Sequence, residues 1–221
     1  MLSRLKLYQS MIGDGLVPLF YHPDSDTAIA TTEALIQAGA RLLEFTNRGP
    51  QALKVFGELV NYCQHYHPNF ILGVGSIEDA PTAALFLAQG AQFIVGPNAK
   101  EEIAKLCNQR KIAYIPGCGS INEITLAESW GLEIIKLFPA NLYGPEFIKA
   151  LKGPRPWSSI MPTGGVKLEE KSLRAWFEAG AVCVGGGSDL ISQADLASKD
   201  GESIRKKTQA ALELIRRIRQ T

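Results

Sequence analysis

One short pattern constrains the fold of this chain more than any other feature. Four segments with helical apolar periodicity end at a glycine, and a run of apolar residues follows each of them at once. The glycines are Gly39, Gly90, Gly131 and Gly180. A glycine directly after a helix adopts the left-handed conformation that ends it, and a short turn then leads into a strand. The chain is therefore predicted to alternate helices with β-strands.

Eight apolar runs have the length of buried strands. They cover residues 16–21, 42–46, 70–74, 93–96, 112–116, 134–138, 158–162 and 182–185. The predicted helices between and after them cover residues 27–38, 50–66, 78–89, 99–109, 121–129, 145–152, 169–179 and 204–219. One extra amphipathic helix, at residues 2–12, precedes the first strand.

Strands that alternate with helices pair in parallel through crossover connections. Eight such units within 221 residues fit an α/β fold of the (β/α)8 or TIM barrel type, with an extra N-terminal helix. An open doubly wound sheet is the alternative, but no G-x-G-x-x-G motif follows the first strand. We expect residues 1–221 to form a single barrel domain, because no linker or low-complexity tract interrupts them.

Charge and hydropathy exclude several partners. Lys plus Arg total 23 and Asp plus Glu total 22, and the resulting net charge of +1 gives no reason to expect nucleic acid or an anionic membrane. No apolar run reaches the roughly 18 residues of a membrane span, and the first residues lack the apolar core of a secretory signal. A cytoplasmic protein is expected. The cysteines form no C-x-x-C pair and the histidines are scattered, so no metal site is predicted.

Lys136 lies inside the apolar run at 134–138, which is predicted to be a buried strand. Burial removes water from the ammonium group and lowers the pKa of a lysine. A neutral amine is a nucleophile towards carbonyl groups, so a buried lysine is a candidate for covalent catalysis. The alternatives are a lysine that extends to the strand end or one that pairs with a carboxylate.

The second predicted strand carries polar side chains on one face. Alternation along a strand places Glu44, Thr46 and Arg48 on the same side, towards the barrel interior or its mouth. Such a cluster on an otherwise apolar strand indicates a site, with Thr46 and Arg48 expected to contact a substrate. The alternative is a buried ion pair of Glu44 with Arg48 or Lys136.

Active sites in (β/α)8 barrels lie at the carboxyl ends of the strands. Ser76 follows the third strand there, and with Asp79 it is predicted to form a capping box at the start of the next helix. Glycine-rich turns follow the last two strands, at 162–165 and 184–188. Their backbone N–H groups favour an anion, and a phosphate site after these strands recurs in this fold. Tight turns without a ligand are the alternative.

Four segments carry a resemblance to a known family. They are Glu44–Arg48, Ile135–Ala140, Pro162–Val166 and Val184–Ser188. In order and separation they resemble the 2-keto-3-deoxy-6-phosphogluconate (KDPG) aldolase family, whose members include 4-hydroxy-2-oxoglutarate aldolases. The resemblance implies a class I aldolase on a (β/α)8 barrel, a cytoplasmic homotrimer that acts on a small keto acid and needs no cofactor.

The resemblance also implies roles for single residues, with Lys136 as the Schiff-base lysine and Glu44 as the general acid/base. The keto-acid end is expected to contact Arg48, Thr163 and Ser76. The phosphate is expected to contact Gly164, Gly165, Gly187 and Ser188, while Pro97 and Phe138 shape the pocket. The chain departs from the pattern at Ser76, where threonine is common, and at Asp189, where an aromatic or apolar residue is frequent. A carboxylate so close to the phosphate loop leaves open a shorter substrate without phosphate, or a sugar acid of different configuration.

Two other functions fit parts of the same pattern. A phosphosugar isomerase or phosphate-dependent synthase would use the glycine-rich turns equally well, with Lys136 as an electrostatic group. A non-catalytic sensor of a phosphorylated metabolite is less consistent with a carboxylate beside a buried amine, because simple binding does not need that pair.

Overall fold

The computed structural model describes residues 3–198 and 201–220. The strands are β1 (Leu16–Phe20), β2 (Leu42–Thr46), β3 (Ile71–Gly75), β4 (Phe93–Val95), β5 (Ala113–Ile115), β6 (Gly117–Cys118), β7 (Ile134–Leu137), β8 (Ser159–Pro162) and β9 (Val184–Gly186). The helices are α1 (Arg4–Asp14), α2 (Ser25–Gln37), α3 (Ala52–Tyr66), α4 (Ala80–Gln89), α5 (Glu101–Arg110), α6 (Ile121–Ser129), α7 (Ala140–Tyr143), α8 (Pro145–Lys152), α9 (Glu170–Glu178), α10 (Gln193–Ser198) and α11 (Gly201–Gln220).

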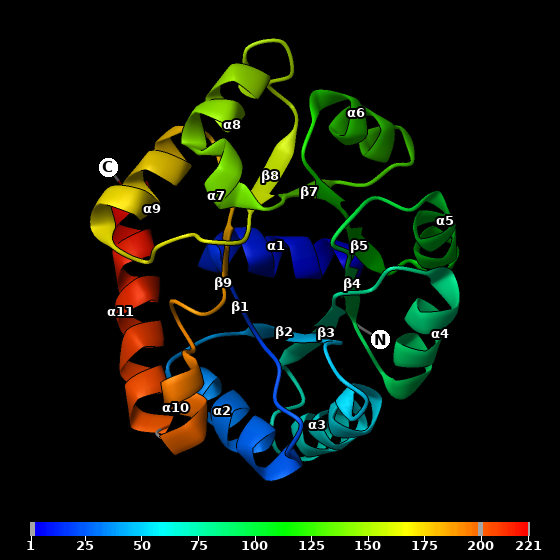
Figure 1. Ribbon diagram of the computed structural model, residues 1–221, viewed down its shortest axis with the longest axis vertical. Coiled ribbons are helices and arrows are strands. Elements are labelled where there is room, and N and C mark those ends of the chain that lie inside the picture. The colour runs from blue at the N-terminus through cyan, green and yellow to red at the C-terminus, as the bar shows by residue number, and fades with distance from the viewer. Residues whose placement is uncertain (1–2, 199–200, 221) are drawn as a thin grey trace.

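The strands form a curled, parallel β-structure with helices around it (Figure 1). One sheet has the order β5-β4-β3-β2-β1-β9 and a second has the order β6-β7-β8. A parallel bridge between Ile160 and Ala181 joins β8 to the segment before β9, where the Val182 N–H donates to the Ile160 carbonyl at 3.0 Å. The expected α/β fold with parallel strands is confirmed.

Each predicted strand has a counterpart, and the four repeat glycines have the expected positive φ, between 80° and 110°. The sequence did not predict the two-residue strand β6, which follows β5 after Pro116. Proline has no N–H to continue the hydrogen-bond ladder, so the fifth strand is divided there. The short helices α7 and α10 were also missed, because four and six residues are too few to show helical periodicity.

Side chains alternate between two hydrophobic clusters along each strand. On β7, Ile134 belongs to the inner cluster and Ile135 to the outer one beneath the helices. The inner cluster fills the amino ends of the strands, and α1 adds Leu7, Tyr8 and Met11 to it. Helix α1 therefore covers the amino-terminal end of the β-structure, and it lies behind the strands in Figure 1.

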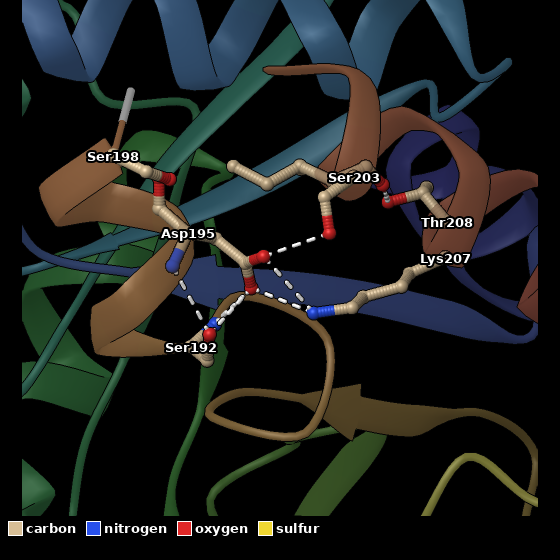
Figure 2. Close-up of polar contacts among 7 residues, drawn as sticks. Ser192, Asp195, Ser198, Ser203, Lys207 and Thr208 are labelled. Carbon is tan, nitrogen blue, oxygen red and sulfur yellow. Dashed lines mark hydrogen bonds and ion pairs between the residues drawn. The ribbon is translucent and has the colours of Figure 1, made fainter. Parts of the chain in front are cut away.

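Near the C-terminus, Asp195 links α10 to α11 (Figure 2). Its Oδ2 accepts hydrogen bonds from the Ser192 N–H at 2.9 Å, the Ser192 Oγ at 2.6 Å and the Lys207 Nζ at 2.8 Å. Its Oδ1 accepts from the Ser203 Oγ at 2.8 Å. Burial raises the pKa of Asp195, but these hydrogen bonds outweigh burial and hold its pKa well below the ordinary value.

Replacing Asp195 with asparagine is expected to lower the free energy of unfolding by about 1–3 kcal/mol at neutral pH. Because folding lowers the pKa of Asp195, its contribution is complete above the ordinary aspartate pKa of about 4 and is lost progressively below it. Urea unfolding of both proteins between about pH 7 and pH 2.5 measures the difference. A difference that does not shrink at the acidic end contradicts this account.

The four cysteines are buried and form no disulfide bond. Among the described helices, none combines the length and apolar character that crossing a bilayer requires. Across the same described ranges, no group of three or more His, Cys, Asp or Glu side chains is arranged to hold a metal ion.

Candidate active site

Lys136 lies on the inner face of β7, two residues after the inward-facing Ile134. It is only 5% exposed. Burial lowers the pKa of Lys136, the Glu44 carboxylate opposes this effect, and the Arg48 guanidinium adds to it, so the net pKa lies below the ordinary lysine value. The Lys136 Nζ lies 4.8 Å from the centre of the Phe138 ring. The structure therefore places an amine with a lowered pKa on the inner side of the curled β-structure.

Glu44 lies on the inner face of β2 and is 1% exposed. Its Oε2 is buried without a hydrogen-bond partner. Within residues 3–198 and 201–220, no Lys or Arg nitrogen lies within the 4.0 Å that would make an ion pair with Glu44. The buried ion pair of Glu44 with Arg48 or Lys136 that the sequence left open is thus absent from the described residues, and Glu44 keeps an oxygen free for a proton or a ligand.

Gly75, the last residue of β3, makes room for the Glu44 carboxylate. A Cβ at this position would overlap the Glu44 Oε1. Glycine is therefore required here for steric reasons, since only a residue without a side chain lets the carboxylate lie against the backbone of the neighbouring strand.

Replacing Gly75 with alanine is expected to displace the Glu44 carboxylate. If Glu44 is the general acid/base that the family resemblance implies, kcat is expected to fall about a hundredfold, the cost of misplacing such a group by about 1 Å. Gly201→Ala is the matched control, because a Cβ there meets only the Ala34 Cβ at an ordinary 3.6 Å. Steady-state kinetics with circular dichroism to verify folding make the comparison. A Gly75→Ala enzyme that is folded and fully active would show that Glu44 does not need this position.

A pocket of about 170 Å³ opens beside Lys136 at the carboxyl ends of the strands. It brings together eight of the residues that the sequence singled out. They are Lys136, Arg48, Phe138, Thr163, Gly164, Gly165, Gly187 and Ser188. Both glycine-rich turns therefore reach the same cavity as the buried lysine. The Thr163 Oγ1 is buried without a hydrogen-bond partner, which leaves it free to bind a ligand.

Four predicted site residues do not line this pocket: Glu44, Thr46, Ser76 and Pro97. Thr46 is fully buried and its hydroxyl donates to the Phe20 carbonyl at 3.3 Å. Ser76 lies at the edge of the site, where its Oγ accepts a hydrogen bond from the Arg48 Nε at 3.3 Å. Pro97 packs its carbonyl over Gly117, where a Cβ would overlap it.

The predicted capping box at Ser76 is wrong. Asp79 is the N-cap of α4, and its carboxylate accepts from the Thr82 N–H at 2.6 Å and the Thr82 Oγ1 at 2.9 Å. Ser76 has a φ of 59°, a left-handed conformation that is uncommon for serine. The turn at Ser76 directs its hydroxyl to Arg48 and leaves the start of the helix to Asp79.

The structure adds residues to the pocket that the sequence did not assign to it. They are Leu19, Val166, Lys167, Gly185 and Asp189. Asp189 departs from the family pattern and follows the second glycine-rich turn, but the sequence pattern gives it no role in the site. The position of Lys167, directly after the Pro162–Val166 segment, was the available signal for its place in the site.

A second cavity, of about 960 Å³, lies at the amino ends of β3 to β5 and includes Lys6, His67 and Arg110 in its lining. None of the predicted site residues lines it. Its cysteine, Cys63, has a pKa raised to about 11 by burial and by the Glu33 carboxylate, so its thiol is unreactive at neutral pH. The smaller pocket around Lys136 is therefore the better candidate for chemistry.

Comparisons with known proteins identify the family of this chain. The chain matches a family model described as KDPG and KHG aldolase over residues 9–207. It is 30% identical over 197 residues to 2-dehydro-3-deoxy-phosphogluconate aldolase of Dickeya dadantii, covering 89% of this chain and 90% of that protein. It is 29% identical over 196 residues to 2-dehydro-3-deoxy-6-phosphogalactonate aldolase of Escherichia coli K12, covering 88% and 90%.

Among solved structures, KDPG aldolase from Legionella pneumophila has a TM-score of 0.85 at 25% identity, covering 92% of this chain and 97% of that one. The family match and the named relatives define the class: the protein is a carbon–carbon lyase of the aldolase type. Within that class, the chain belongs to the KDPG and KHG aldolase family.

Proposed function

We propose that this chain is a class I aldolase that cleaves a 2-keto-3-deoxy-6-phospho sugar acid to pyruvate and glyceraldehyde 3-phosphate. We further propose that it cleaves 4-hydroxy-2-oxoglutarate to pyruvate and glyoxylate. The observation that carries the proposal is the buried Lys136 amine, with its lowered pKa, at a pocket whose other wall is two glycine-rich loops. The Legionella structure supports it, since that protein captured pyruvate as a covalent carbinolamine intermediate.

In this mechanism the neutral Lys136 amine attacks the C2 ketone of the substrate. Loss of water from the carbinolamine gives a protonated imine. The imine accepts the electron pair of the C3–C4 bond as that bond breaks, and no metal is needed for the same step. The resulting enamine is protonated at C3, and hydrolysis of the imine then releases pyruvate and restores the amine.

Glu44 serves as the general base and acid in this proposal. It removes the C4 hydroxyl proton through a water molecule, so that the leaving fragment departs as an aldehyde, and then returns a proton to C3 of the enamine. Its unpartnered Oε2 and its effect on the pKa of Lys136 support this role, since they indicate a free carboxylate whose charge acts on the amine.

The remaining pocket residues bind the two ends of the substrate. Arg48 and Thr163 bind the keto-acid end, where a guanidinium fork suits a carboxylate. Gly164, Gly165, Gly187 and Ser188 bind the phosphate through backbone N–H groups and a hydroxyl. The left-handed φ values of Gly164 and Gly165, 93° and 73°, support this arrangement, because they turn the loop at the pocket.

We also propose that the two sheets act as one closed (β/α)8 barrel in a single domain, and that the protein is a homotrimer. The bridge between Ile160 and Ala181 and the hydrogen bond from the Lys136 N–H to the Pro116 carbonyl, at 2.9 Å, support closure of the barrel. Multi-angle light scattering tests the trimer.

Reduction with borohydride in the presence of pyruvate tests the imine. The intact mass is expected to rise by one reduced pyruvate adduct, and peptide mapping is expected to locate the adduct at Lys136. An unchanged mass rejects imine chemistry and favours an isomerase or synthase in which Lys136 is an electrostatic group. Treatment without pyruvate is the control for non-specific modification.

A further inference from the structure

Asp189 joins the two glycine-rich loops of the pocket. Its Oδ1 accepts a hydrogen bond from the Lys167 Nζ at 3.0 Å, and its Oδ2 accepts from the Leu168 N–H at 2.8 Å. Lys167 and Leu168 follow β8, whereas Asp189 follows β9, so these two bonds connect one half of the loop wall to the other. Lys167 and Asp189 both line the cavity that Lys136 reaches.

The Asp189 carboxylate is charged and already engaged. Burial raises its pKa, but the hydrogen bonds from Leu168 and Lys167 outweigh burial and lower the pKa below the ordinary value. Each of its oxygens accepts one of these bonds. A negatively charged ligand at the loops therefore meets a carboxylate whose charge is opposed by the adjacent Lys167 ammonium.

Lys167 keeps donors for a ligand. An ammonium group has three N–H donors, and Asp189 accepts one of them. The Lys167 side chain is 66% exposed, so its remaining donors are accessible to a ligand. Lys167, Arg48 and Lys136 are the Lys and Arg side chains of the pocket lining. Arg48 donates a hydrogen bond to Ser76, and Lys136 is the proposed nucleophile. Among the described residues of the pocket lining, Lys167 is therefore the cation that remains to bind a ligand at the glycine-rich loops.

We infer that Lys167 binds the terminal phosphate of the substrate and that Asp189 positions it, so that this ion pair determines specificity for a phosphomonoester over the same keto acid without phosphate. The inference rests on the proposed function, because it concerns the distal end of the same site. It resolves the role of the carboxylate beside the phosphate loop: Asp189 holds a cation there and does not repel the substrate.

Lys167→Met tests the cation, because methionine keeps the length of the side chain and removes its charge. The ratio of kcat/KM for 2-keto-3-deoxy-6-phosphogluconate to kcat/KM for 2-keto-3-deoxygluconate is expected to fall about tenfold, mainly through a higher KM for the phosphorylated substrate. Lys167→Arg is expected to restore most of the ratio. Lys105→Met is the matched control, since Lys105 is 69% exposed and ion-paired with Glu101 at 2.8 Å outside the pocket.

Asp189→Asn tests the positioning role, because asparagine can still accept from the Leu168 N–H but no longer attracts Lys167. The ratio is expected to fall in this variant too, by a factor smaller than in Lys167→Met. A ratio that Lys167→Met leaves unchanged overturns the inference. A ratio that falls in Lys167→Met but not in Asp189→Asn overturns the role of Asp189.

Pyruvate trapping separates these outcomes from failure of the proposed function. Suppose that borohydride reduction with pyruvate gives an adduct at Lys136 of the wild-type protein, and that this protein cleaves both substrates. An unchanged kcat/KM ratio in Lys167→Met then counts against the phosphate contact alone. If wild-type protein forms no adduct, the aldolase mechanism fails first, and the inference about Lys167 fails with it.

Discussion

Lys136→Met is expected to abolish cleavage, with kcat reduced by at least ~10³-fold, because in the proposed mechanism the Lys136 imine accepts the electron pair of the breaking bond and the variant cannot form it. Methionine has a volume similar to that of lysine and retains contact with the Phe138 ring, so the protein is expected to remain folded. Removing a buried amine also removes its desolvation cost. The variant is therefore expected to be at least as stable as the wild type.

Three measurements check this result: cleavage of the phosphorylated keto acid in a coupled pyruvate assay, borohydride trapping, and thermal unfolding. The variant is expected to show neither cleavage nor an adduct, at a melting temperature no lower than that of the wild type. Lys105→Met is the control for loss of one positive charge at a surface site. Substantial cleavage by folded Lys136→Met would show that the Lys136 amine of the wild type does not act as a covalent nucleophile.

Glu44→Gln is expected to lower kcat by about 10²–10⁴-fold, the usual contribution of a general acid/base group. Glutamine preserves the shape of the side chain above Gly75 but cannot carry the C4 or C3 proton. The rate is expected to fall with little change in KM, because the group acts in the transition state. A variant that loses only affinity would show that Glu44 binds substrate and does not move protons.

The same variant is expected to change the pH dependence of adduct formation in a defined direction. The Glu44 carboxylate raises the pKa of Lys136 against the lowering effect of burial, so its removal lowers that pKa further. Because the neutral amine is the reacting form in the proposed mechanism, trapping by pyruvate is expected to begin at a lower pH in Glu44→Gln than in wild type. Rates of trapping measured across the pH range test the shift. A movement towards higher pH would mean that the two groups are not coupled in this way.

Local sequence patterns were sufficient to predict where Lys136 and Glu44 lie. Strand alternation needs only that the strand be identified, and both side chains are on the inner face as the apolar residues around them required. The glycines that end helices were also predictable, since only the conformation of one residue decides them.

Features that depend on distant contacts could not be predicted in this way. Ser76 fits a capping pattern, but its left-handed backbone gives that role to Asp79. The contact between Lys167 and Asp189 spans 22 residues and exists only because β8 and β9 end side by side. Nor does the sequence show that Gly75 leaves space for a carboxylate from the neighbouring strand, because this depends on the register that pairs Thr46 with Gly75.

Helix α1 packs Leu7 and Met11 against the inward side chains at the amino ends of the strands, both with no exposed surface. Helix α1 therefore closes the amino-terminal end of the β-structure. Substrate and products are expected to enter and leave at the opposite rim, formed by the carboxyl ends of the strands. In the proposed cleavage the pyruvyl fragment stays tethered to Lys136 while the aldehyde fragment sits nearer that rim. Under this proposal the aldehyde is expected to leave first and pyruvate second.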